Sequence, residues 1–365
     1  MEKIIKKVIN TIEKDGFEAY IVGGYVRDML LGNISYDIDI CTNALPKDLI
    51  RLFPNSRVGV YGAVDFKIKK FSFEITTYRK ELKYENRHPT EVIYINNLLE
   101  DLQRRDFTIN TFCMNQKDNV IDLLDAKKDL DNHVIKCIGN EKTKIIEDPL
   151  RILRAIRFAT LLNFELDKNL YQVIYDNNSL IQTLSSKRIK EELDKILLSD
   201  NFKVGLNLLK ELGLLECLGM SYNEGIKKVH DINGMWAQIN FQNYLAFTKE
   251  SRHNISTLKE ILFKGKIDNE TVYKYGLYLC SVASEILKID RKVINMIYKN
   301  LPIYSVKDIN VSTEKIIKYL SIKEGKKVGM ILDDLVLQIL KGKLKNDTKS
   351  IYKYLDKFRE ENNEN

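Results

Sequence analysis

The stretch of residues 20–40, YIVGGYVRDMLLGNISYDIDI, constrains this chain more than any other segment. It begins as a short apolar strand pattern, breaks at Gly23 and Gly24, and continues as a short helical pattern over 25–31. A second strand pattern follows at 36–40, where polar and apolar residues alternate. The segment therefore predicts a strand, a glycine turn, a short helix and a second strand in immediate succession.

The glycine turn has the features of a phosphate site. Paired glycines let backbone N–H groups approach an anion closely, and a helix that starts directly after them adds its positive dipole end. Arg27 contributes a guanidinium fork that matches phosphate oxygens. We therefore predict that Gly23, Gly24 and Arg27 bind the phosphates of a nucleotide.

Asp37 and Asp39 are the candidate catalytic and metal-binding residues. They are two apart on a strand, so both carboxylates leave the same face, while Ile38 and Ile40 point into a core. Two hard carboxylates beside a phosphate site suit Mg²⁺ and phosphoryl transfer. A lone glycine pair or a lone Asp-x-Asp usually has no such role, but both together, joined by a helix with an arginine, favour the functional interpretation.

Composition sets broad limits. The chain has 365 residues, of which 44% are hydrophobic and 30% charged, as in soluble globular proteins large enough for several domains. There is no uncharged apolar stretch of about 18 residues and no signal-peptide core, so we expect no membrane span and a cytoplasmic protein. The net charge of +7 is compatible with RNA binding but does not by itself indicate it.

Cysteine and histidine patterns exclude two kinds of site. The five cysteines are scattered and form no C-x-x-C pair, which argues against a disulfide framework and a structural zinc site. The four histidines are equally dispersed, so no histidine-based metal centre is expected.

The segment after the Asp pair reads as a hairpin followed by a loop. Apolar and polar residues alternate over 64–68 and 71–76, which predicts two strands. Glu74 lies on the polar face of the second strand, so it is a third metal-binding candidate if the strands are neighbours, and otherwise a surface residue. The polar, aperiodic segment 80–90 is predicted to be a loop, either a mobile lid or a plain connection.

GGYVRDMLLG followed by YDIDI resembles the signature of the class II tRNA nucleotidyltransferase and bacterial poly(A) polymerase family. Members add nucleotides to RNA 3′ ends without a nucleic-acid template. RRDFTIN at 104–110 resembles the second motif of the family, which implies nucleotide binding by Arg105, Asp106 and Asn110, with Asp106 near the sugar. The segment around Asp122 and Asp129 resembles a turn motif of the family. The glycine of that motif is absent here, because Asp125-Ala126 stands at its place.

The segment from Glu147 predicts a strong helix. Asp148 is a natural N-cap, Pro149 fits the first helical position, and three arginines recur every third residue as a basic band. On these residues alone a solvated arginine row is the simpler interpretation. EDPLR followed by RAIRF resembles the base-reading segment of the family, which implies that Asp148 and Arg151 contact the Watson–Crick edge of the incoming base. The same resemblance implies nucleotide binding by Arg154 and Arg157.

The chemistry of base reading agrees with the choice of C and A. Both bases present an exocyclic amino donor that a carboxylate accepts, whereas G and U present a carbonyl at that place.

Serine and basic residues at 185–188 predict a further capped helix, resembling the family motif that supports the base-reading helix. From residue 201 the pattern is helical, with lysine-rich faces that could hold an RNA backbone.

The resemblance extends over residues 20 to about 195. It implies an α/β nucleotidyltransferase head, built of a small mixed sheet with helices, followed by an all-α, elongated neck, body and tail. We expect the head at 1–140, a base-recognising neck at 141–200, and a tRNA-binding body and tail at 201–365. The expected function is addition of CCA to tRNA from CTP and ATP with Mg²⁺. A CC-adding or A-adding enzyme, a poly(A) polymerase and a non-catalytic RNA-binding protein are the alternatives, and the oligomeric state is left open.

Overall fold

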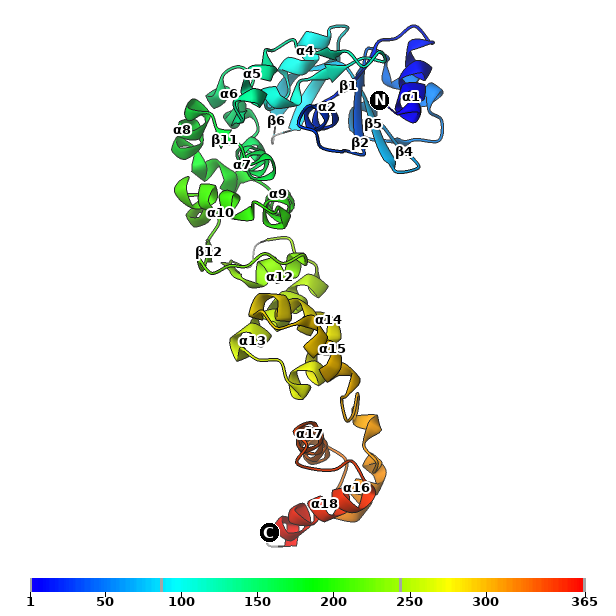
Figure 1. Ribbon diagram of the computed structural model, residues 1–365, viewed down its shortest axis with the longest axis vertical. Helices are drawn as coiled ribbons and strands as arrows, with labels where there is room; N and C mark the ends of the chain where they lie inside the picture. Colours follow the sequence, from blue (N-terminus) through cyan, green and yellow to red (C-terminus); the bar gives the residue numbers. More distant parts are fainter. Residues whose placement is uncertain (1, 86–87, 243–244, 364–365) are drawn as a thin grey trace. The chain divides into compact units, whose positions relative to one another are not determined.

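The computed structural model describes residues 2–85, 88–242 and 245–363, which divide into two compact units (Figure 1). Unit 1 comprises Met1–Met220 and Phe241–Ala246, and unit 2 comprises Ser221–Asn240 and Phe247–Asn365. The finer division into head, neck, and body with tail stays a prediction.

Unit 1 holds the strands and most of the short helices, with the 3-10 helices labelled η. Its elements are α1 (Lys3–Glu13), β1 (Ala19–Val22), α2 (Gly24–Leu30), β2 (Asp37–Thr42), α3 (Pro46–Leu52), β3 (Arg57–Val58), η1 (Val60–Gly62), β4 (Val64–Ile68), β5 (Phe71–Thr77), β6 (Arg79–Glu85), β7 (His88–Tyr94), α4 (Leu98–Gln103), η2 (Thr108–Asn110), β8 (Cys113–Met114), β9 (Val120–Ile121), α5 (Ala126–Asp131), β10 (Val134–Ile135), α6 (Glu141–Glu147), α7 (Leu150–Leu162), β11 (Glu165–Leu166), α8 (Lys168–Asp176), η3 (Asn178–Thr183), α9 (Ser186–Leu198), α10 (Phe202–Glu211) and α11 (Leu214–Cys217).

Unit 2 is almost entirely helical. Its elements are α12 (Ile232–Ala237), α13 (Lys249–Lys264), α14 (Asn269–Leu287), α15 (Arg291–Lys299), η4 (Val306–Asp308), α16 (Thr313–Leu320), α17 (Lys326–Leu340) and α18 (Thr348–Asn363). The strands β12 (Met220–Tyr222) and β13 (Ile239–Phe241) lie where the chain passes between the units. Among the helices of the described chain, none is long and apolar enough to cross a membrane.

The main sheet of unit 1 has the strand order β3-β4-β5-β2-β1-β8-β9. β2 and β5 pair in parallel and the other neighbours are antiparallel, so the predicted mixed sheet is confirmed. Ile38 and Ile40 of β2 are fully buried, while Asp37 and Asp39 face the opposite side, as the alternation predicts. Figure 1 shows α2 beside β1 and β2, so the glycine turn lies next to the Asp pair.

The predicted hairpin at 64–76 is confirmed as β4 and β5, but the loop predicted at 80–90 is wrong. The chain instead forms β6 and β7, which pair with each other in a two-stranded sheet apart from the main one. Such a ribbon has no face in the main core, so it needs no apolar alternation and gives no period-two pattern. Asn86 and Arg87, which belong to the segment predicted as a loop, lie outside the described residues.

The turn that lacks the family glycine keeps a glycine-like backbone. Asp125 has φ +54°, in the left-handed region that glycine favours and that aspartate tolerates better than most residues. Asp122 stabilises the turn, because its two carboxylate oxygens accept the N–H groups of Ala126 at 2.9 Å and Lys127 at 2.8 Å. The segment therefore forms β9, this turn, α5 and β10 in succession, although the glycine of the family motif is absent.

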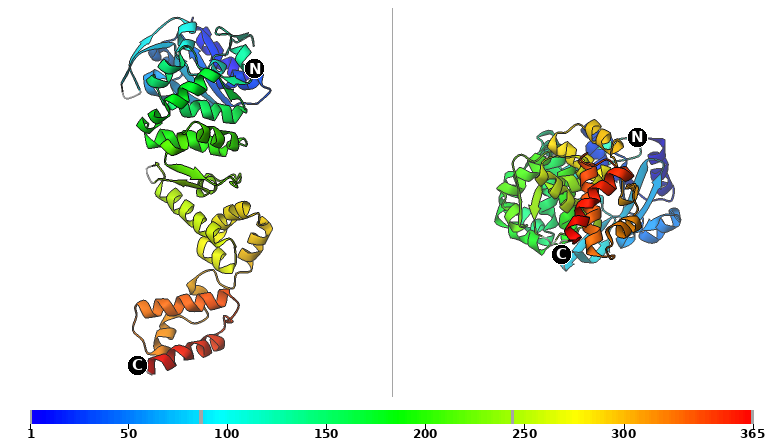
Figure 2. Two further views of the ribbon diagram at one scale, coloured as in Figure 1. Left: turned by 90° about the vertical axis from the view of Figure 1, so that its left-hand side faces the viewer. Right: turned by 90° about the horizontal axis from the view of Figure 1, so that it is seen from below.

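The helices that follow the sheet in unit 1 pack against each other. In the views of Figure 2 the green helices α7, α9 and α10 lie side by side. Gly205 permits this approach, since a Cβ at that position would collide with Thr160 of α7 and Ile196 of α9. The predicted capped helix near 185 is confirmed as α9, where the Ser185 side chain accepts the N–H of Arg188.

Candidate active site

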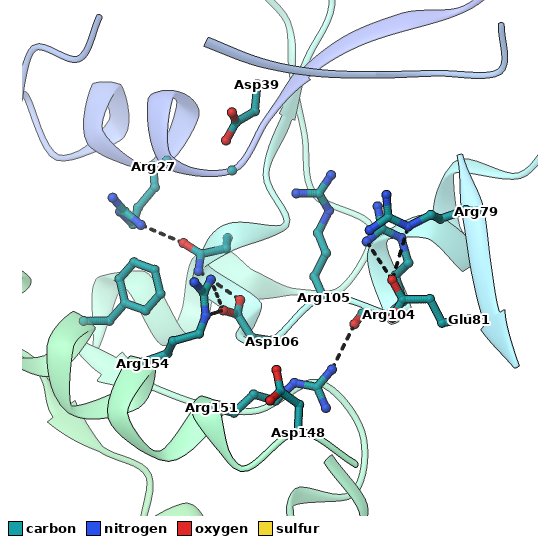
Figure 3. Close-up of a pocket in the computed structure, with 14 residues that line it drawn as sticks. Arg27, Asp39, Arg79, Glu81, Arg104, Arg105, Asp106, Asp148, Arg151 and Arg154 are labelled. Carbon is teal, nitrogen blue, oxygen red and sulfur yellow. Dashed lines mark hydrogen bonds and ion pairs between the residues drawn. The ribbon is translucent and has the colours of Figure 1, made fainter. Parts of the chain in front are cut away.

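Unit 1 contains a cavity of about 490 Å³ between the sheet and α7 (Figure 3). It is lined by Gly23, Gly24, Arg27, Asp39, Arg79, Glu81, Arg104, Arg105, Asp106, Asn110, Asp148, Arg151, Arg154 and Phe158. Ten of the thirteen site residues predicted from sequence are in this lining, although they come from segments more than 100 residues apart. The three that do not line it are Asp37, Glu74 and Arg157.

The glycine turn forms one wall of the cavity. Gly23 has φ +78°, which strongly favours glycine, and it immediately precedes α2. A Cβ built on Gly23 would lie 3.6 Å from an oxygen of Asp39 and 3.8 Å from a guanidinium nitrogen of Arg105. The backbone turn, a carboxylate and an arginine therefore meet at one place, as expected for a site that binds a phosphate and a cation together.

The carboxylates of the sheet lie on neighbouring strands. Asp39 of β2 is the register partner of Glu74 in β5, so the condition under which Glu74 was a third candidate, that the two strands are neighbours, is met. Burial raises the pKa of Asp39 and the negative charge of Asp37 raises it further, against the opposing effect of Arg105. Burial likewise raises the pKa of Glu74, with added contributions from Asp39 and Asp65. A cation would relieve this accumulation of negative charge.

The donor set fits a hard divalent cation held by two carboxylates. Within the described residues, no group of three or more acidic, histidine or cysteine side chains is arranged so that it could hold a metal ion. Mg²⁺ is usually bound by one or two carboxylates, with water and substrate phosphates filling the other positions. The pair Asp37 and Asp39 suits this mode, and the role of Glu74 stays a prediction.

A chain of hydrogen bonds crosses the floor of the cavity. Arg27 Nη1 donates to Asn110 Oδ1 at 2.6 Å, and Asn110 Nδ2 donates to Asp106 Oδ1 at 3.1 Å. Asp106 Oδ1 also accepts the N–H of Phe107 at 2.8 Å, and its Oδ2 accepts two bonds from Arg154, at 2.8 and 2.5 Å. Figure 3 shows Asp106 and Arg154 directed toward one another.

Asp106 therefore has all four of its acceptor positions occupied. A ribose hydroxyl could bond to this carboxylate only by displacing one of these donors, so contact between Asp106 and a sugar stays a prediction. What the geometry shows directly is that Asp106 holds Arg154 and, through Asn110, Arg27. The carboxylate orients two of the arginines that line the cavity.

The acid stability of the protein should depend on Asp106. Burial opposes ionisation, but Arg154, Asn110 and the Phe107 N–H outweigh it and lower the pKa to about 2 from 3.8. An acid with a depressed folded-state pKa stabilises the fold above its unfolded pKa, and loses that contribution as the pH falls through the folded value. We expect Asp106→Asn to lower the free energy of unfolding by about 2 kcal/mol at pH 6.

Urea denaturation of both proteins at several pH values tests this expectation. The difference between Asp106→Asn and the wild type should shrink as the pH falls from about 4 toward 2, because the wild-type carboxylate then becomes neutral as well. A difference independent of pH would mean that the side chain contributes through shape and hydrogen bonding, without its charge.

Asp148 and Arg151 meet at the start of α7, at the far side of the cavity (Figure 3). Asp148 Oδ1 accepts the N–H of Leu150, the first residue of α7, at 3.2 Å, but the N-cap position is occupied by Pro149, so the predicted N-cap lies one residue too early. The other carboxylate oxygen of Asp148, Oδ2, lies 3.6 Å from Arg188 of α9. Arg151 is buried and donates to the carbonyl oxygen of Lys144 at 2.7 Å. Contact with α9 supports the predicted role of the 185–188 segment.

Three family models match successive parts of the chain. They are described as poly A polymerase head domain over residues 19–136, probable RNA and SrmB-binding site of polymerase A over 163–219, and tRNA nucleotidyltransferase domain 2 over 235–355. CCA-adding enzymes of Lactococcus lactis and Ligilactobacillus salivarius are each 32% identical over 97% of this chain and 96% of the relative. The chain belongs to the CCA-adding enzyme family.

The fold agrees with solved structures of CCA-adding enzymes. The CCA-adding enzyme of Bacillus stearothermophilus, solved with CTP, superposes with a TM-score of 0.85 at 24% identity, over 99% of this chain and all of the other. That of Thermotoga maritima, solved with tRNA, superposes with a TM-score of 0.66 at 19% identity, over 97% of this chain and 95% of the other. The nucleotidyltransferase head with a helical remainder is thus confirmed.

The geometry adds residues that the family motifs did not lead us to include. Arg79, Glu81 and Arg104 form a cluster at the edge of the cavity, in which Glu81 lies 3.2 Å from Arg79 and 3.6 Å from Arg104. Behind them the fully buried Asp101 accepts a bond from Arg104 at 2.8 Å and lies 3.4 Å from Arg105. Arg104 and Arg105 follow Asp101 by three and four residues, the spacing that brings side chains together on a helix. This spacing was a signal in the sequence for their part of the cluster.

Arg157 is directed differently from its two neighbours in the basic band. It lies 2.8 Å from Glu192 of α9 and stacks on the ring of Phe158, with its guanidinium carbon 4.3 Å from the ring centroid. Arg157 therefore joins α7 to α9, and its nucleotide-binding role stays a prediction. Nucleotidyltransferases of this family generally use divalent metal ions, which agrees with the paired carboxylates of β2.

Proposed function

We propose that this protein adds cytidine and adenosine to the 3′ end of tRNA, from CTP and ATP with Mg²⁺, and releases pyrophosphate. One observation carries the proposal: a single cavity joins the glycine turn and Asp39 to the base-reading pair Asp148 and Arg151. As an enzyme of tRNA maturation it would work in the cytoplasm.

The phosphate end of the cavity suits a nucleoside triphosphate. Six arginines and four acidic residues line the cavity as a whole, so its lining has an excess of two positive charges. Arg105 lines the cavity, and its Nη1 lies 3.8 Å from the place that a Cβ on Gly23 would take, so its guanidinium group would be beside a phosphate bound at the glycine turn. Asp37 and Asp39 would hold Mg²⁺, which supplies activation of the RNA 3′-hydroxyl and charge stabilisation of the leaving pyrophosphate.

The other end of the cavity suits the base. Asp148 would accept the exocyclic amino group of C or A, and Arg151 would donate to the adjacent ring acceptor. A carbonyl at the place of the amino group, as in U or G, would face the carboxylate and be rejected. Selection of two bases without a template strand then follows from one carboxylate and one arginine.

Nucleotide addition can be tested on a tRNA transcript that lacks its last three nucleotides. With CTP alone the product should grow by two residues, with CTP and ATP by three, and with UTP or GTP by none. Products resolved at single-nucleotide length separate the alternatives: growth that stops after two residues, growth only on a primer ending in CC, and long adenosine tails each indicate a different relative. No addition under any condition would contradict the proposal.

A further inference from the structure

Asp101 is a buried carboxylate on α4, behind the phosphate end of the cavity. Its side chain has no exposed surface, and it does not itself line the cavity. Acidic residues are seldom buried completely unless they are paired with cations, so the partners of Asp101 indicate what it does. Among the described residues, the three partners of its side chain are all arginines that line the cavity: Arg79, Arg104 and Arg105.

The carboxylate of Asp101 contacts these three arginines in different ways. Its Oδ1 accepts the backbone N–H of Arg79 at 3.1 Å and a bond from Nε of Arg104 at 2.8 Å. Its Oδ2 accepts a bond from Nη2 of Arg105 at 3.4 Å. Because Arg79 is the first residue of β6, the same carboxylate also fixes the start of the β6–β7 ribbon. One buried group thus joins the ribbon to two arginine side chains of the cavity.

Arg105 depends on Asp101 more than Arg104 does. Among residues 2–85, 88–242 and 245–363, no other carboxylate forms an ion pair with Arg105, whereas Arg104 also lies 3.6 Å from Glu81. Nη2 of Arg105 is the atom that bonds to Asp101, while Nη1 lies 3.8 Å from the place that a Cβ on Gly23 would take. Asp101 therefore holds one nitrogen of the guanidinium group and leaves the other beside the glycine turn.

The negative charge of Asp101 lies among positive charges that repel one another. Burial lowers the pKa of Arg104, and Asp101 opposes this effect. The charges of Arg105 and Arg79 lower the same pKa further. In Figure 3 the guanidinium group of Arg105 lies on the same side of the cavity as Asp39. Without the charge of Asp101 we expect the arginine side chains to move apart, and Arg105 to leave its place beside the glycine turn.

We propose that Asp101 is a positioning residue for nucleotide addition, which acts through Arg105 on the phosphates of the incoming nucleotide. The proposal rests on the proposed function, because it assumes a nucleoside triphosphate in the cavity. The buried charge of Asp101 sets the place of Nη1 of Arg105, and it also holds Arg104 and the start of the ribbon. A displacement of about 1 Å at such a site can cost about a hundredfold in rate, so a residue that touches no substrate can have a large effect.

Asp101→Asn tests the role of the charge, since asparagine has nearly the same shape and can still accept the N–H of Arg79. In the extension of a truncated tRNA, the KM for CTP should rise about tenfold while the KM for tRNA changes less than about twofold. The affinity advantage of CTP over cytidine, measured by equilibrium dialysis, should also fall about tenfold, because cytidine has no phosphates. An unchanged KM for CTP, or equal losses for CTP and cytidine, would overturn the inference.

The same helix offers a matched control. The Asn97 side chain caps α4 by accepting the N–H of Glu100 at 3.2 Å, and it does not line the cavity. Asn97→Ala should loosen α4 and lower the melting temperature, while the KM for CTP changes less than about twofold. An equal rise of this KM in Asn97→Ala and Asp101→Asn would also overturn the inference, because loosening of the helix would then explain both.

A double variant tests whether Asp101 acts through Arg105. Asp101→Asn leaves the charge of Arg105 without its partner, which costs stability, whereas Asp101→Asn combined with Arg105→Gln removes both charges. The double variant should have the same KM for CTP as Arg105→Gln alone, within about threefold, and this comparison decides the matter even if Asp101→Asn does not fold. Losses that multiply would contradict the inference. Failure of the wild-type protein to extend tRNA, with the CTP affinity still dependent on Asp101, would instead refute the proposed function.

Discussion

Replacing Asp39 with alanine should lower the rate of nucleotide addition by about 10³-fold or more, since it removes a metal ligand and charge stabilisation from the transition state. Asp39 lines the cavity beside Gly23, on the same strand face as Asp37. Single-turnover addition of one cytidine to a truncated tRNA, with Mg²⁺ in excess, measures the effect. Near-normal addition would contradict the assignment of Asp39 to the metal.

The fold should survive this change. The pKa of Asp39 is raised by burial and by Asp37, so its ionised form is disfavoured in the folded protein and stability falls as the pH rises through that pKa. Asp39→Asn should therefore melt at the same temperature as the wild type or higher at neutral pH, while addition is lost. Asp65 is a matched control: it pairs with Glu74 in the sheet but does not line the cavity, so Asp65→Ala should retain addition.

Asp148→Ala should change which nucleotide is incorporated. If Asp148 accepts the amino group of the base, its removal abolishes the penalty against a carbonyl there. The preference for CTP and ATP over UTP and GTP should then fall by about ten- to a hundredfold, which corresponds to about 1–3 kcal/mol for an unpaired polar group. Competition among all four nucleoside triphosphates on one truncated tRNA measures this preference.

The bond of Asp148 to the start of α7 requires a separate control. Its bond to the Leu150 N–H should contribute about 1 kcal/mol of stability whether or not it reads a base. Asn140 stabilises the start of α6 in a similar way, by accepting the N–H of Thr143 at 2.9 Å, but it does not line the cavity. Asn140→Ala should cost similar stability with unchanged selectivity. An Asp148→Ala protein that is destabilised yet equally selective would refute base reading.

The local part of the site was predictable from sequence because it depends on short-range rules. The alternation in β2 determines that Asp37 and Asp39 share a face, and the glycine turn can be read from two adjacent residues. Whether Glu74 lies beside Asp39 depends on which strands are neighbours. That order is set by the packing of the whole sheet, so only a conditional prediction was possible for Glu74.

The row of three arginines on α7 shows a second limit of prediction from sequence. Residues three apart on a helix advance by about 300°, so Arg151, Arg154 and Arg157 spread over about 120° of its circumference. The first two reach the cavity and the third reaches Glu192. Spacing predicts the band, but the boundary between cavity and helix interface depends on where α9 packs. The β6–β7 ribbon was missed for a related reason, since pairing between two strands alone leaves no hydrophobic pattern.

The hydrogen-bonded chain from Arg27 through Asn110 and Asp106 to Arg154 has a consequence for how a substrate is received. These side chains lose their rotational freedom when the protein folds, so a nucleotide that arrives meets donors already in place and little further entropy is lost on binding. A preorganised floor of this kind offers the same fixed surface to either nucleotide. Adaptation of the cavity to a smaller or larger base must then come from other residues of the protein, outside this series of hydrogen-bonded side chains.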